Sequence, residues 1–272
     1  MLNLREIHQP TTLADALKYL QQPGAVAFAG GTELIAGRRL DVSAVVDLSQ
    51  LGLSYIRESS GAIALGATTT LAELAESPIL RAVADGVIAR AAHGSAASVL
   101  RNQETIAGTL IVEPDGLLAA VLLALDAQAT VIRKDTRTVT LADFLSMREH
   151  LLMMALITEI TVPLTNPRAS LQTVARTPAD KPIVSVCAAA RNEKGVLRDL
   201  RIALAGVGET AIRASAAEKM LEGQDLSAAD LQQTAATAAH DLSPQGDFRG
   251  SVEYRKEMAR VLTHRALREL AA

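Results

Sequence analysis

The sequence predicts an α+β protein built from two or three lobes. Three observations support this prediction. The chain of 272 residues is long for one compact domain. Its first part alternates strand-like and helix-like segments, whereas its last part has several strands followed by three helical segments in succession. Residues 163–167, with a proline at each end, lie between the two parts and are the best candidate linker.

The N-terminal elements are short. Thr11 or Thr12 is expected to open a helix that carries leucines at helical spacing, and Pro23-Gly24 ends it. The strand after this helix is apolar and stops at Gly30-Gly31-Thr32. The strands expected in this region are 2–7, 25–29 and 43–48.

The middle of the chain predicts a second group of elements. Thr70-Leu-Ala-Glu73 has capping-box spacing, so a helix is expected to begin there. Pro78 opens a further helical stretch to about His93, and a polar loop separates it from an apolar helix over 117–125. The strands expected here are 55–57 and 62–65, paired as a hairpin, and then 129–133, 137–141 and 157–162.

Beyond the candidate linker the order of elements changes. Strands are expected near 171–175, 183–190 and 200–205. Three helices then begin near Ala211, Ser227 and Ser251. Strands followed by clustered helices are typical of an α+β domain with its helices on one side of the sheet.

Composition excludes several classes of function. A net charge of −3 without a block of like charges offers no electrostatic footprint for nucleic acid or an anionic membrane. No apolar run reaches the roughly 18–20 residues of a membrane span, and the N-terminus lacks a signal peptide's apolar region. The single cysteine, Cys187, leaves no internal disulfide or cysteine-ligated iron–sulfur cluster and is expected to be a core residue. We therefore expect a cytoplasmic protein.

The first candidate binding loop runs from Phe28 to Glu33. Gly30 and Gly31 let the backbone approach a ligand closely and present successive N–H groups to an anion, and Thr32 adds a hydroxyl donor. A pyrophosphate fits such a loop. An ordinary tight turn is the alternative interpretation, because Gly-Gly marks turns generally.

The second candidate binding loop lies within Leu100–Leu110. Small residues, hydroxyls and backbone amides that we expect to be accessible come together at Thr105, Ala107, Gly108 and Thr109. Arg101 is either a structural cation or a ligand contact. Two such loops in one lobe favour a diphosphate bound by donors from both.

Other motifs give no site. Gly206-Val-Gly-Glu-Thr-Ala211 matches G-x-G-x-x-A, but no second strand with an acidic end follows, so we interpret it as a tight strand-to-helix turn. The five histidines are scattered without metal-ligand spacing. No Walker loop or G-x-S-x-G elbow occurs, and we name no catalytic residue and no metal ligand.

Several segments, in order along almost the whole chain, together carry a resemblance to one family. They include 29–34, 65–74, 101–108, 205–208 and 251–255. The set resembles the FAD-binding (medium) subunits of molybdenum hydroxylases, the flavoproteins of aerobic carbon-monoxide dehydrogenases and xanthine dehydrogenases. The resemblance implies a two-lobed FAD-binding domain (PCMH-like) at 1–165, with lobes of about 1–52 and 53–165. A smaller α+β C-terminal domain at 168–272 follows.

The resemblance also implies a function. FAD would receive electrons from iron–sulfur clusters on a small partner subunit and pass them to an external acceptor. The substrate would react on a molybdenum-binding large subunit. A single cysteine in this chain fits clusters carried by another chain. The implied cofactor-binding residues are Phe28, Ala29, Gly30, Gly31, Thr32, Glu33, Arg101, Thr105, Ala107, Gly108, Thr109, Asp115, Ile157 and Gln172.

Three departures from the family pattern bear on FAD binding and keep an FAD-free subunit open as an alternative. The second loop reads Ala107-Gly108-Thr109 where the family usually has Gly-Gly-Asn. Downstream, the family commonly has an Asp that contacts the FAD ribose; the segment 113–116 is shorter here, and Asp115 is the candidate for that role. Gln172 replaces a basic residue near the flavin ring. The alternatives are an independent FAD oxidoreductase and an FAD-free assembly subunit of such a complex.

Overall fold

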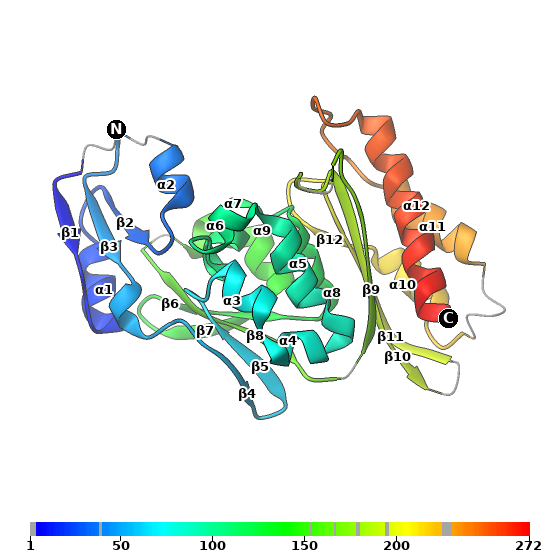
Figure 1. Ribbon diagram of the computed structural model, residues 1–272, viewed down its shortest axis with the longest axis horizontal. Helices are drawn as coiled ribbons and strands as arrows, with labels where there is room; N and C mark the ends of the chain where they lie inside the picture. The colour runs from blue at the N-terminus through cyan, green and yellow to red at the C-terminus, as the bar shows by residue number, and fades with distance from the viewer. Residues whose placement is uncertain are drawn as a thin grey trace.

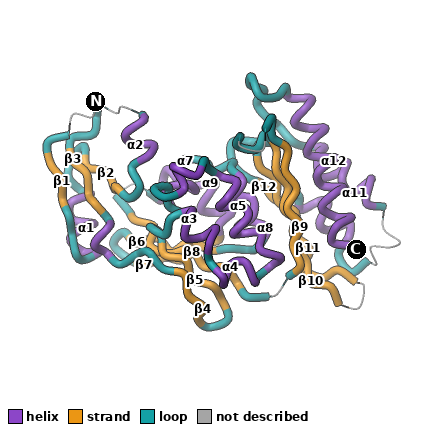
Figure 2. Tube along the Cα trace, viewed as in Figure 1, coloured by secondary structure: helices purple, strands orange, loops and turns teal. Residues whose placement is uncertain are grey.

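The chain folds around three β-sheets that follow one another along its long axis (Figure 1). The computed structural model describes residues 4–37, 40–152, 154–165, 167–177, 180–193, 196–224 and 230–272. Helices and strands are interleaved along the whole length of the molecule (Figure 2). The α+β class predicted from the sequence is confirmed.

The N-terminal lobe, residues 4–52, contains a parallel sheet of order β1-β3-β2. Its strands are β1 (Glu6–His8), β2 (Ala25–Phe28) and β3 (Ala44–Asp47). Helix α1 (Leu13–Leu20) begins as predicted, because the Thr12 side chain accepts a hydrogen bond from the Asp15 N–H at 3.1 Å. A short helix, α2 (Thr32–Ala36), follows β2. The strand predicted at 2–7 begins at Glu6, and residues 2 and 3 lie outside the described residues.

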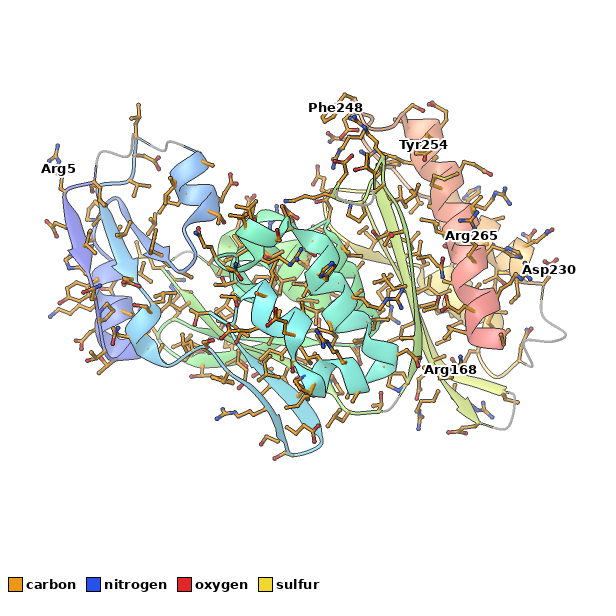
Figure 3. All side chains as sticks on the ribbon, in the orientation of Figure 1. Arg5, Arg168, Asp230, Phe248, Tyr254 and Arg265 are labelled. Atoms are coloured by element: carbon orange, nitrogen blue, oxygen red, sulfur yellow. The ribbon has the colours of Figure 1, made fainter. Side chains whose placement is uncertain are left out.

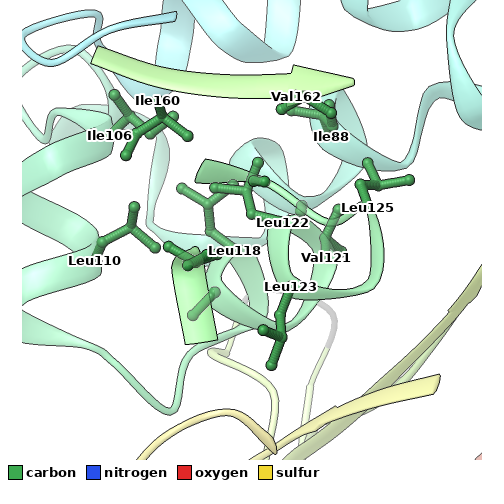
Figure 4. Close-up of a cluster of buried hydrophobic side chains, with 14 of the residues drawn as sticks. Ile88, Ile106, Leu110, Leu118, Val121, Leu122, Leu123, Leu125, Ile160 and Val162 are labelled. Atoms are coloured by element: carbon green, nitrogen blue, oxygen red, sulfur yellow. The ribbon is translucent and has the colours of Figure 1, made fainter. Parts of the chain in front are cut away.

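The middle lobe, residues 53–165, contains an antiparallel sheet of order β4-β5-β8-β6-β7. Its main core packs around α8 (Leu117–Ala124), a helix whose residues are all buried. Figure 4 shows leucines of α8 grouped with Ile106 and Leu110 of the preceding helix and with Ile160 of β8. The strands are β4 (Ile56–Ser59), β5 (Ala62–Gly66), β6 (Gln128–Ile132), β7 (Thr136–Thr140) and β8 (Leu156–Pro163).

Helices of the middle lobe differ from the prediction in three places. Helix α3 (Leu71–Glu76) begins at the predicted capping box, but the stretch predicted over 78–93 is broken at Asp85, which has a φ of 53°. The backbone at this break is tied to residue 169 of the C-terminal domain, because the Asp85 carboxylate accepts a hydrogen bond from the Ala169 N–H at 2.9 Å. The predicted polar loop contains two short helices, and a helix follows β7 where none was expected. These helices are α4 (Pro78–Ala82), α5 (Val87–Ser95), α6 (Ser98–Arg101), α7 (Ile106–Val112) and α9 (Leu141–Leu151).

The C-terminal domain, residues 168–272, has an antiparallel sheet of order β12-β11-β10-β9. One face packs against α8, and α12 covers the other face (Figure 1). The strands are β9 (Arg168–Val174), β10 (Val184–Glu193), β11 (Val196–Ala205) and β12 (Ile212–Arg213). The helices are α10 (Ser215–Leu221), α11 (Leu231–His240) and α12 (Val252–Ala271).

The C-terminal helices agree only partly with the prediction. Ser251 caps α12 as expected, since its side chain accepts from the Tyr254 N–H at 3.2 Å. The helix predicted near Ala211 begins at Ser215, because β12 intervenes. The start predicted near Ser227 lies outside the described residues. Because the sheet changes between β8 and β9, we propose the domain limits 1–165 and 168–272, with a lobe division near residue 52.

Two further features are the environment of the cysteine and the lengths of the apolar helices. Cys187 is fully buried in β10, as predicted for a core residue, and burial raises the pKa of its thiol to about 12. Within the described part of the chain, no single helix has the length and hydrophobicity to cross a membrane. Helices α7 and α8 meet those criteria only as a pair bent by 107°.

Candidate functional site

A pocket of about 890 Å³ lies between the N-terminal and middle lobes. From the N-terminal lobe it is lined by β2, the loop after it and α2. The middle lobe contributes α7 and the start of β8. Its size is within the range of small-molecule and cofactor sites. Eleven of the predicted cofactor-binding residues line it: Phe28, Ala29, Gly30, Gly31, Thr32, Glu33, Thr105, Ala107, Gly108, Thr109 and Ile157.

The two predicted loops touch each other at this pocket. A Cβ atom added at Gly30 would lie 1.8 Å from the carbonyl oxygen of Gln103, so the backbones of the two loops are in direct contact. Gly31 has a φ of 70°, and a Cβ atom there would lie 2.4 Å from the Phe28 ring. Both positions therefore require glycine.

The two loops differ in how many of their backbone N–H groups remain free to bind a ligand. Among the described residues, the N–H groups of Gly30, Gly31 and Thr32 have no hydrogen-bond partner, so they can bind an anion. The prediction of accessible amides in the second loop is wrong. The Ala107 N–H donates to the Ala67 carbonyl at 3.2 Å, and the Gly108 N–H donates to the Thr105 hydroxyl at 3.3 Å.

The second loop offers a hydroxyl instead. Thr109 lines the pocket and is 7% exposed, and its Oγ1 is buried without a hydrogen-bond partner. A buried polar group without a partner costs about 1–3 kcal/mol. This hydroxyl therefore fits a ligand that supplies its missing partner.

Charged side chains gather at the rim of the pocket. Three carboxylates, Glu33, Glu104 and Glu113, line it together with the ammonium group of Lys181. Lys181 Nζ is paired with the Glu113 carboxylate. Burial raises the pKa of Glu104, and the negative charges of Glu113 and Glu33 add to this shift while Lys181 opposes it. Lys181 was not predicted, because it lies far along the chain from both loops.

Three predicted residues do not line the pocket. Arg101 donates from Nη1 to the carbonyls of His93 and Ala96 at 3.0 and 2.8 Å, so it is a structural cation at the end of α5. Asp115 lies beyond α7, and burial raises the pKa of its carboxyl. Gln172 faces α12, where its Nε2 donates to Glu269 and to the Ser170 hydroxyl.

Comparison with known proteins identifies the family. Residues 3–165 match the family described as FAD binding domain in molybdopterin dehydrogenase, and residues 154–270 match the CO dehydrogenase flavoprotein C-terminal domain. The chain belongs to this family. It is an FAD-binding medium subunit of the type found in CO dehydrogenase and related molybdenum hydroxylase complexes, so the resemblance stated above is confirmed.

Relatives and solved structures match this FAD-binding subunit over nearly its whole length. The glyceraldehyde dehydrogenase medium chain of Sulfolobus acidocaldarius is 28% identical and YgfM of Escherichia coli K12 is 31% identical. These matches cover 96% and 95% of this chain, and 96% and 93% of the relatives. The CO dehydrogenase structures from Oligotropha carboxidovorans and Hydrogenophaga pseudoflava match with TM-scores of 0.90 and 0.88, at 27% and 28% identity. They cover 98% and 97% of this chain, and 97% and 96% of theirs.

Proposed function

We propose that this subunit binds FAD in the pocket between its N-terminal and middle lobes and serves electron transfer within a molybdenum hydroxylase complex. One observation carries the proposal. The two loops predicted to hold the cofactor meet at a single pocket, with free N–H groups on one side and an unpaired hydroxyl on the other.

The residues of the pocket have distinct roles in this proposal. The N–H groups of Gly30, Gly31 and Thr32 hold the diphosphate, because successive free amides form an anion-binding concavity. The Thr109 hydroxyl pairs with a polar group of the cofactor. Apolar side chains such as Val26, which lines the same pocket, exclude water. When bound, FAD supplies the redox chemistry, so the chain itself needs no acid or base.

The proposed partners are a molybdenum-binding large subunit and an iron–sulfur small subunit. Electrons would arrive from clusters on the small subunit and leave to an external acceptor. The names of several relatives support this proposal, since they are medium chains or subunits of dehydrogenases and a nicotine hydroxylase. The single cysteine of this chain, fully buried, agrees with clusters held elsewhere.

Titration of the flavin-free chain with FAD tests the proposal. We expect binding of one FAD per chain, a flavin visible spectrum and a higher unfolding temperature, because a ligand that binds only the native state stabilises it. Failure to bind FAD, both alone and with the partner subunits, would instead indicate an assembly subunit. Substrate turnover by the isolated chain would indicate an independent oxidoreductase.

Substitution of Thr109 tests the role of the unpaired hydroxyl. We expect Thr109→Val to weaken FAD binding about tenfold, because the cofactor loses a hydrogen bond worth roughly 1.4 kcal/mol. The flavin-free variant should be at least as stable as the unchanged protein, since valine has nearly the same shape and removes a buried polar atom without a partner. Isothermal titration and thermal unfolding measure the two effects.

Thr109→Ser is the matched control, because it keeps the hydroxyl and removes only a methyl group. It should retain FAD affinity within about threefold while losing some stability. Equal FAD affinity of the valine variant and the unchanged protein would exclude a contact between this hydroxyl and the cofactor.

A further inference from the structure

Lys181 is the pocket residue contributed by the C-terminal domain. It lies between β9 and β10, whereas the other described residues that line the pocket fall between Leu20 and Ile157. Its side chain is 43% exposed, so the ammonium group sits at the rim rather than in the core. Within the described part of the C-terminal domain, Lys181 is therefore the residue that reaches the pocket, and it brings a positive charge.

The negative charges around the pocket give the positive charge of Lys181 a role in binding an anionic cofactor. Among the described lining residues, three carboxylates stand beside a single ammonium group, so this described part of the rim carries more negative than positive charge. The diphosphate of FAD is itself an anion. Like charges repel, and this repulsion acts over several ångströms at a partly exposed rim. Without Lys181 the rim would oppose entry of the cofactor more strongly.

The segment that carries Glu113 is fixed to the C-terminal domain. The Gly206 N–H donates to the Asp115 carbonyl at 3.0 Å, and the Ala211 N–H donates to the Pro114 carbonyl at 2.7 Å. The ion pair between Lys181 and Glu113 is a third link at the same place. Because the backbone bonds already hold the segment, a half-exposed ion pair adds little to the docking of the domains.

We propose that Lys181 determines the affinity of the pocket for the diphosphate of FAD, by supplying from the C-terminal domain a positive charge beside the rim carboxylates Glu33, Glu104 and Glu113. This inference rests on the proposed function. It makes the C-terminal domain part of the cofactor site rather than only its neighbour. Glu113 then competes with the cofactor for the ammonium group.

FAD titration of flavin-free full-length variants tests the inference. We expect Lys181→Gln to weaken FAD binding at least tenfold, and Glu113→Gln to tighten it severalfold because one negative charge is removed. Riboflavin, which lacks the diphosphate, should bind both variants within about twofold of the unchanged protein. The loss for FAD should shrink in 1 M salt, where exposed charges are screened. Lys134→Gln, in the exposed turn between β6 and β7, is the control for net charge.

Several outcomes would overturn the inference. FAD binding by Lys181→Gln within twofold of the unchanged protein would exclude a role for the charge. An equal loss of affinity for riboflavin and FAD would show that Lys181 acts on the shape of the pocket. Both results presuppose that the unchanged protein binds FAD. If it does not, the proposed function fails, and this inference fails with it.

Discussion

Gly30→Ala is expected to lower the affinity of this subunit for FAD by at least about 100-fold. The added methyl group would lie 1.8 Å from the carbonyl oxygen of Gln103 and 2.6 Å from its carbonyl carbon. Both are backbone atoms, so no side chain can rotate away and the two loops must separate. Small displacements of positioned groups have large effects on ligand binding and catalysis. Calorimetric titration of the flavin-free protein measures the loss.

Two other glycine variants show whether the clash causes the effect. Gly108→Ala brings its methyl group only to 3.0 Å from the Thr105 hydroxyl, a side-chain atom, so a smaller loss of affinity is expected. Gly208→Ala in the C-terminal domain makes only an ordinary contact at 3.5 Å and should bind FAD normally. Circular dichroism checks that Gly30→Ala still folds, since overpacking costs about 1–3 kcal/mol. A folded Gly30→Ala variant with unchanged FAD affinity would contradict the assignment of the pocket.

The sequence was sufficient to locate the two loops but not to distinguish their roles. Gly-Gly after an apolar strand and the small residues of the second loop mark places where a backbone can approach a ligand. Which N–H groups remain free depends on contacts across the fold. For example, the N–H of Ala107 donates a hydrogen bond to the carbonyl of Ala67, a residue forty positions earlier in the chain.

Helix α7 was predicted as a loop because of its composition. Gly108 and two threonines around it are poor helix formers. Ile106 and Leu110, spaced by one helical turn, are fully buried in the main core, and this packing overrides the weak propensity. The Thr105 cap was a usable signal, because a threonine directly before an apolar residue often opens a helix.

Sequence reasoning from the residues alone could not tell which residues of the C-terminal domain lie at the pocket. Gln172 and Leu171 are neighbours in β9, yet Leu171 faces the main core and Gln172 faces Glu269 on α12. Alternation along a strand predicts that the two side chains lie on opposite faces, but it does not reveal which face packs against the middle lobe. Lys181 reaches the pocket because the C-terminal domain docks on the middle lobe, through contacts with α8 and hydrogen bonds to the segment at 114–115.

Arg255→Met is expected to destabilise the protein by about 3 kcal/mol, the largest loss of stability that we predict, because buried carbonyl groups lose their hydrogen-bond donor. Arg255 lies near the start of α12, and only 4% of its surface is exposed. Its Nη1 donates to the carbonyls of Ile183 and Gly206 at 2.8 and 2.9 Å, and its Nη2 donates to Asp247 at 2.8 Å. Methionine keeps the apolar packing of the side chain but leaves the carbonyls of Ile183 and Gly206 without this donor, and Asp247 with one donor fewer.

Urea unfolding at pH 7 measures the loss, and Arg265→Met on the exposed face of α12 is the matched control (Figure 3). Equal stability of the two variants would exclude the proposed role of Arg255.

The pH dependence of stability identifies the contribution of Asp247 to the same cluster. Burial raises the pKa of Asp247, but hydrogen bonds from Arg249, Arg255 and two backbone N–H groups outweigh this effect and hold the pKa well below its ordinary value. A lowered pKa stabilises the folded state above the unfolded pKa of about 3.9, and this stabilisation is lost as the pH falls through the folded pKa. Asp247→Asn should therefore be less stable than the unchanged protein at pH 7, and the difference should narrow in acid. A difference independent of pH would mean that Asp247 acts through its shape and not through its charge.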